Sequence, residues 1–149
     1  MTSSSRPGRT LRKALFICAM LLIFIAIGLA AFHRQAWVVP PAQKEIKNPL
    51  AVSTANLAAA KEIYNDKCAN CHGDGGKGDG PDAMMYDPAP SDLTDAKVAT
   101  KTDGELYYQI TEGRKPMPSF KKKLTDEQRW QLVLFVRSLE GAPASTVQK

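Results

Sequence analysis

The sequence predicts an all-α domain with three to four helices and long loops, preceded by a single N-terminal transmembrane helix. Three observations predict this architecture. Capping signatures at Thr102 and Thr125 each open an amphipathic segment with a helical period. No pair of alternating strand patterns is visible in the 149 residues. An uncharged run occupies residues 14–32, near the N-terminus.

The N-terminal region carries most of the basic charge of the chain. Residues 1–52 contain seven Lys and Arg against one acid, whereas residues 53–149 contain thirteen against fourteen, a formal net charge of −1. The basic isoelectric point therefore does not describe the folded part, which lacks the basic and aromatic surface of a nucleic-acid-binding protein. We expect no nucleic-acid partner.

Residues 14–32 are long enough to cross a membrane as a helix. At 1.5 Å per residue the run spans about 28 Å, close to a hydrocarbon core of roughly 30 Å. The basic residues 1–13 should form a cytoplasmic tail and direct the remaining chain outward. A cleaved signal peptide is the alternative, although its apolar core usually has only about 7–15 residues. We therefore expect a single-pass anchor in a bacterial cytoplasmic membrane, with the folded domain on the periplasmic or outer face.

The remaining chain divides into three parts. Residues 33–52 contain prolines and polar residues and predict a linker. Residues 53–141 form the exported domain, and residues 142–149 a flexible tail.

Within the domain the predicted helices bury little apolar surface. They cover residues 55–66, a short segment from the Thr102 cap to Gly113, and a longer one from the Thr125 cap to Leu139. Residues 73–101 are rich in Gly, Pro and Asp and predict a loop of nearly thirty residues. Because such a loop is unusual in a compact domain, we expect a large apolar cofactor to fill the core.

The segment Cys68-Ala-Asn-Cys71-His72 indicates which cofactor this is. Cys-x-x-Cys-His is the attachment sequence for a covalent haem c. In one helical turn, residues i, i+3 and i+4 share a face, so both thiols can reach the haem vinyl groups and His72 can reach the iron. The glycines of residues 73–80 would let the backbone pass close to a flat macrocycle and adopt positive φ. We therefore expect one haem c, bound through Cys68 and Cys71, with His72 as an axial ligand.

Other uses of these residues fit less well. A structural zinc site needs four ligands, but the only other histidine, His33, lies beside the apolar run. A redox-active disulfide would need a thioredoxin-like context, and no alternation of strands and helices is present.

The second axial ligand is expected to be Met117. Pro116 and Pro118 flank it and disfavour both helix and strand, so the thioether is held on an extended loop. Met84 and Met85 lie closer to the histidine, and we interpret them as packing residues. His/Met ligation is typical of electron-transfer cytochromes.

These motifs resemble the class I cytochrome c family. The resemblance covers about residues 53–141 and includes the haem motif, Gly80-Pro81, the Met117 loop and the terminal helix. It implies a cytochrome c-like fold in which the first and last helices cross, with Ala60 and Tyr64 against Leu132 and Phe135. It also implies that the carbonyl of Pro81 accepts a hydrogen bond from the Nδ1–H of the histidine.

The resemblance implies a single-electron carrier of a respiratory or photosynthetic-type chain, not an enzyme, with no small-molecule substrate. Its partners would be redox proteins. Basic residues near the methionine loop are candidates for docking an acidic partner: Arg114, Lys115, Lys121, Lys122 and Lys123. Two alternatives stay open, namely a fixed haem c subunit of a larger membrane oxidoreductase complex and a haem gas sensor with an open distal site.

Overall fold

The computed structural model describes residues 12–13, 15–20 and 37–139. The chain divides into two compact units, Met1–Trp37 and Val38–Lys149. In the first unit, residues 12–13 and 15–20 are helical. Most of the expected anchor, residues 14–32, and the expected tail, residues 142–149, lie outside the described residues. In the part of the chain that is described, no helix has the length and apolar character needed to span a bilayer.

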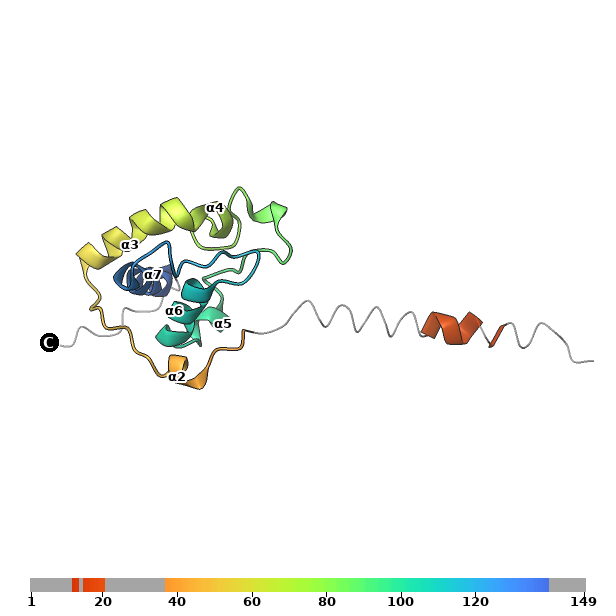
Figure 1. The fold of residues 1–149 in the computed structure, drawn as a ribbon. Coiled ribbons are helices and arrows are strands. Elements are labelled where there is room, and N and C mark those ends of the chain that lie inside the picture. The colour runs from red at the N-terminus through yellow and green to blue at the C-terminus, as the bar shows by residue number, and fades with distance from the viewer. Residues whose placement is uncertain (1–11, 14, 21–36, 140–149) are drawn as a thin grey trace, which may run out of the picture. The chain divides into compact units, whose positions relative to one another are not determined.

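The second unit is helical throughout its regular structure (Figure 1). Its elements in chain order are α2 (Pro41–Lys44), α3 (Thr54–Lys67), α4 (Ala69–His72), the 3-10 turn η1 (Ala83–Met85), α5 (Ala96–Ala99), α6 (Asp103–Glu112) and α7 (Asp126–Leu139). The three longer helices α3, α6 and α7 lie where the sequence predicts helices. The predicted loop over residues 73–101 is correct apart from two short turns, η1 and α5.

Capping side chains fix where the longer helices begin. Thr102 Oγ1 accepts a hydrogen bond from the Glu105 backbone N–H, and the Glu105 carboxylate accepts one from the Thr102 N–H. The same exchange joins Thr125 and Gln128 at the start of α7. Both capping signatures in the sequence are therefore confirmed.

The crossing of α3 and α7 forms the first apolar cluster. Ala60 and Tyr64 are buried against Leu132 and Phe135, and the rings of Tyr64 and Phe135 lie 4.7 Å apart. Ala60 is 0% exposed, so the two helices meet at a small residue. The implied helix crossing is confirmed.

A second cluster lies between α6 and α7. Leu106 packs against Val133, and the indole of Trp130 stacks on the ring of Tyr107 at 4.0 Å. Leu93 and Ile110 are half-buried and contact both clusters, so the two clusters are continuous.

Residues 38–52 differ from the predicted linker. They belong to the same compact unit as the helices, and α2 packs on α6. Figure 1 shows this segment, in orange, passing along α6 before it reaches the start of α3. We call residues 38–52 the strap. Its composition is that of a linker, but Val39 is buried and Leu50 packs at the second cluster, which holds the segment on the domain.

Candidate functional site

Cys68, Cys71 and His72 lie on a single helical turn. The backbone N–H groups of Cys71 and His72 both donate to the Cys68 carbonyl, at 3.1 and 2.8 Å. Both thiols are free and half-buried. The turn therefore has the i, i+3, i+4 spacing that the sequence predicts.

The imidazole of His72 is oriented by the loop that follows it. Nδ1 lies 3.0 Å from the Ser91 carbonyl oxygen, which can only accept, so Nδ1 carries the proton and Nε2 keeps its lone pair. Burial lowers the pKa of His72, and the bond to Ser91 partly opposes that change. The neutral ring is the form that binds a metal.

The partner of Nδ1 differs from the one that the resemblance implies. Pro81 is exposed, and the observed bond goes to Ser91, nineteen positions beyond His72. The physical reason is the path of the loop, which brings residues 90–93 back against the glycine run. Leu93 N–H donates to the Gly76 carbonyl at 2.6 Å.

Two glycines permit this return of the chain. A Cβ on Gly80 would lie 2.3 Å from the Asn70 carbonyl oxygen, and one on Gly78 would lie 2.5 Å from that of Pro90. Gly78 also has a φ of +75°. The expected positive φ is thus confirmed there, but the close neighbours of these glycines are protein backbone on the histidine side. They hold the Ser91 carbonyl in place.

The Cys68 side chain is not a reactive thiolate. Burial, followed by the charges of Cys71 and Asp66, raises the pKa of the Cys68 thiol to about 12. Redox-active and nucleophilic cysteines have lowered pKa values in electropositive surroundings. The environment therefore does not favour a redox-active or nucleophilic thiolate at Cys68.

Met117 lies at the tip of a tightly closed loop. Gly113 ends α6 with a φ of +62°, and a Cβ there would lie 2.4 Å from the Pro118 carbonyl oxygen. Beyond the tip, Ser119 Oγ donates to the Thr111 carbonyl at 2.7 Å, and Lys121 N–H donates to it at 3.1 Å. Phe120 is buried beneath the loop.

The three methionines that follow the histidine differ in exposure. Met84 is 99% exposed and Met85 69%, whereas Met117 is half-buried. Met84 and Met85 lie in η1 at the protein surface, and their expected packing against the porphyrin stays a prediction.

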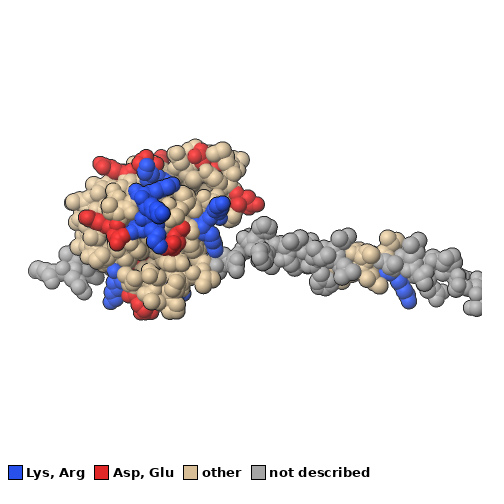
Figure 2. Space-filling view, viewed as in Figure 1, with Lys and Arg blue, Asp and Glu red and all other residues tan. Residues whose placement is uncertain are grey.

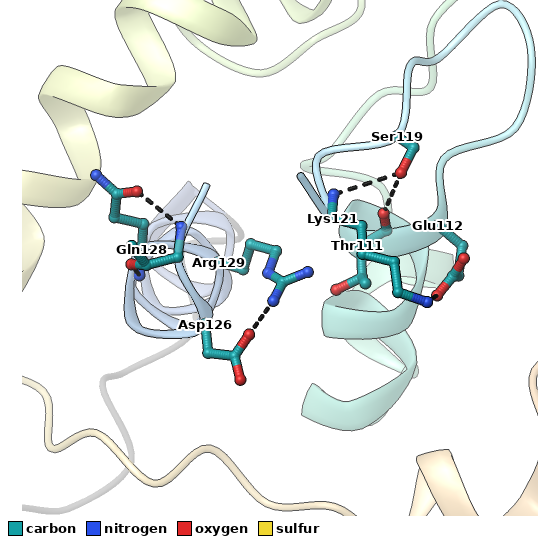
Figure 3. Close-up of polar contacts among 8 residues, drawn as sticks. Thr111, Glu112, Ser119, Lys121, Asp126, Gln128 and Arg129 are labelled. Atoms are coloured by element: carbon teal, nitrogen blue, oxygen red, sulfur yellow. Dashed lines mark hydrogen bonds and ion pairs between the residues drawn. The ribbon is translucent and has the colours of Figure 1, made fainter. Parts of the chain in front are cut away.

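A buried arginine lies behind the methionine loop. Figure 3 shows Arg129 reaching from α7 towards α6, with its guanidinium near Thr111. The side chain lies over the Tyr107 ring at 5.2 Å and pairs with Asp126 through Nη2. Its Nε and Nη1 atoms, and Thr111 Oγ1, have no hydrogen-bond partner within the described residues. The sequence offered a signal for this burial, since Arg129 precedes Leu132 and Val136 by three and seven residues and so shares the apolar face of α7.

The basic residues beyond Met117 are exposed and partly paired. The Lys121 ammonium lies 2.9 Å from a Glu112 carboxylate oxygen, and Lys123 lies over the Phe120 ring. Figure 2 shows Lys and Arg side chains grouped on the viewed face, with carboxylates beside them.

These donors fit a covalently attached haem. Two free thiols stand on the same turn as an imidazole whose Nε2 is unprotonated, which is the donor set that a haem c requires. In the described ranges, no cluster of three or more His, Cys, Asp and Glu side chains is arranged to hold a bare metal ion.

Comparison with known proteins agrees with this donor set. Residues 55–136 match the family model described as cytochrome c oxidase, cbb3-type, subunit III. The chain is 30% identical over 83 residues to a cytochrome c6 of Leptolyngbya boryana, covering 55% of this chain and 91% of that protein. It is 27% identical over 82 residues to a cytochrome c6 of Parathermosynechococcus lividus, covering 55% and 88%.

A solved structure is also similar. A chain of the reducing HAO-like protein complex of Kuenenia stuttgartiensis superposes with a TM-score of 0.53 at 33% identity. The match covers 73% of this chain and 53% of that chain, about half of its length.

The fold, the site and the relatives define a monohaem c-type cytochrome, an electron-transfer protein with a covalently bound haem c. The chain belongs to the family of the cbb3-type cytochrome c oxidase subunit III.

Proposed function

We propose that this protein is a membrane-tethered carrier of single electrons, with haem c joined to Cys68 and Cys71 and its iron held by His72 and Met117. Residues 14–32 anchor it as a single-pass helix, and residues 53–141 lie on the periplasmic face. The observation that carries the proposal is the α4 turn, on which two free thiols accompany an imidazole whose Nδ1 already donates to Ser91.

The bound haem supplies one-electron cycling between Fe(II) and Fe(III). His72 on α4 and Met117 on the loop after α6 would hold the iron, and the chain adds no general acid or base, since His72 is used as a ligand. Hydrogen bonding to Ser91 fixes the imidazole plane and increases the basicity of Nε2. A thioether on the other side raises the reduction potential. These roles fit a carrier and not an enzyme.

An optical spectrum of the oxidised protein tests the ligand assignment. We expect the wild type to show the weak red charge-transfer band of iron–thioether bonding, and Met117→Ala to lose it. Met85→Ala is the matched control and should keep it. Loss of the band in the control alone would assign the ligand to Met85 instead.

A second candidate is a fixed subunit of a larger membrane oxidoreductase. The family description names a subunit of an oxidase, and the similar solved chain comes from a protein complex. Purification in mild detergent separates the two candidates. A carrier should elute alone, whereas a subunit should elute with stoichiometric partners.

A further inference from the structure

We propose that the strap, residues 38–52, shortens the tether of the haem domain, so that the domain exchanges electrons with its redox partner close to the membrane surface. This inference rests on the proposed membrane anchor.

The strap fits closely against α6. A Cβ on Gly104 would lie 1.9 Å from the Gln43 carbonyl oxygen and 2.8 Å from that of Ile46. Only glycine permits the strap backbone to approach α6 this closely. Lys44 Nζ also pairs with a Glu105 carboxylate oxygen at 3.1 Å, next to the close approach.

Contacts continue along the strap to α7 and α3. The Asn48 side-chain amide donates to the Trp130 carbonyl at 3.0 Å and accepts from the Leu50 N–H at 3.0 Å. At the far end, the Asn56 amide donates to the Ala51 carbonyl at 2.9 Å. Val39 is 6% exposed at the near end, so the strap is attached along almost its whole length.

This attachment changes how far the domain can reach. The uncharged run ends at residue 32 and the strap begins at residue 38, so residues 33–37 alone separate them. Six peptide units extend at most about 20 Å, whereas a free linker through residue 52 would extend at most about 70 Å.

The short tether limits where a partner can meet the haem domain. A domain of about 100 residues has a radius of gyration of roughly 13 Å, comparable with the tether, so its surface stays next to the bilayer. Confinement gives a high effective concentration towards a partner at the same surface and none towards a distant one. The redox partner must therefore meet the haem domain close to the membrane surface.

Trypsin tests the strap in the full-length protein bound to membranes. Lys44 and Lys47 are cleavage sites within it. We expect slow cleavage in the wild type and cleavage at least about tenfold faster in Gly104→Ala and Asn48→Ala, because protease attack follows the population of the open form. Gly75→Ala is the control, since a Cβ there meets nothing within 4 Å. Equal cleavage rates in all four proteins would show that these contacts do not hold the strap on the domain.

An insertion tests the reach. Fifteen Gly and Ser residues placed between His33 and Arg34 lengthen the tether and leave the strap intact. We expect quenching of a fluorescent headgroup lipid by the haem to fall at least about twofold. The same residues added after Lys149 should change nothing.

The outcomes separate the proposals. Unchanged quenching with the insertion overturns the short reach. Wild-type protein that an alkaline wash removes from the membrane overturns the anchor and the reach together. Protein that stays bound, but is cut as fast as Gly104→Ala, overturns the strap alone. Protein without covalent haem overturns the electron-carrier function, whereas the trypsin result on the strap does not depend on the haem.

Discussion

The two loops beside the proposed iron ligands, one following His72 and one carrying Met117, are built differently. On the histidine side, residues 73–93 return against α4 through close backbone contacts at Gly78 and Gly80. On the methionine side, residues 113–121 are closed largely by hydrogen bonds to the last turn of α6, one of them from the Ser119 side chain.

The two loops therefore differ in how readily their conformation can change. Backbone atoms in contact cannot yield, so a side-chain atom added at Gly78 or Gly80 on the histidine side should have a large effect. A hydrogen-bonded loop can open by degrees, so changes on the methionine side should have graded effects on ligand exchange and potential.

Gly80→Val should have the largest effect. Its Cβ would lie 2.3 Å from the Asn70 carbonyl oxygen and 2.5 Å from that of Ala69, within the haem-attachment turn. We expect a loss of about 3 kcal/mol or more in the free energy of unfolding, together with a low yield of haem-loaded protein. Denaturant unfolding measures the first, and haem absorbance per protein the second. Gly75→Val has open space and should retain most of both; if it failed equally, crowding at Gly80 would not be the cause.

Tyr64→Phe should weaken the histidine side without changing its shape. The buried hydroxyl of Tyr64 donates to the Gly73 carbonyl at 2.7 Å, which ties the end of α4 to α3. Removing it deletes one buried hydrogen bond, while the Gly73 carbonyl still accepts from the Gly76 N–H at 3.1 Å, so we expect a cost of about 1 kcal/mol. Tyr86→Phe, near the surface, is the control for urea unfolding and should change stability by less than about 0.5 kcal/mol.

Ser119→Ala should open the methionine side. The variant loses the 2.7 Å bond to the Thr111 carbonyl, while the backbone bonds of Phe120 and Lys121 to α6 remain. We expect a loss of about 1 kcal/mol and cyanide binding to the oxidised protein about fivefold faster. Ser138→Ala removes a local bond in α7 and should leave cyanide binding unchanged. An unaltered rate in Ser119→Ala would show that this bond does not close the loop.

The sequence predicts the helices well because their signals are local. Capping residues at Thr102 and Thr125 lie within three positions of their partners, and the apolar period of α7 follows directly from the order of residues. The attachment turn is equally local, since Cys68, Cys71 and His72 lie within five positions.

What the sequence does not predict depends on distant contacts. Every residue has a carbonyl, so nothing in the sequence marks that of Ser91 as the partner of His72. The strap has the composition of a linker. Its hydrogen bond from Asn48 to Trp130 joins residues 82 positions apart. Such pairings exist only once the helices have packed.

Arg129→Met tests whether the buried charge behind the methionine loop stabilises the protein. Arg129 is 5% exposed, and two of its guanidinium nitrogens have no hydrogen-bond partner in the described part of the chain. Its paired Asp126 carboxylate is largely in solvent. Replacing a buried charge by an apolar side chain of similar length is often neutral or stabilising, so we expect a change within about 1 kcal/mol. Arg129→Ala leaves a cavity and should lose about 2 kcal/mol. Urea unfolding measures both, and a large loss in the Met variant would show that the charge itself supports the loop.

The histidine side and the methionine side also differ in charge. Residues 66–95, around the histidine, hold seven acids and two lysines, whereas residues 97–123 hold seven Lys and Arg and three acids. If an acidic partner approaches the methionine side, Gln at all three positions of Lys121–Lys123 should slow electron transfer at low ionic strength by roughly three- to tenfold.

The effect on stability of this triple variant should be near zero, because the Lys121–Glu112 pair is exposed and such pairs contribute at most about 1 kcal/mol. Gln at Lys47, Lys61 and Lys77 removes the same charge from exposed positions outside residues 97–123 and serves as the control. The difference between the variants should fade as salt shortens the screening length towards about 8 Å at physiological ionic strength. Equal rates for the two variants would mean that net charge, and not a docking surface beside Met117, steers the partner. A rate difference that persists at high salt would indicate a direct contact in place of long-range steering.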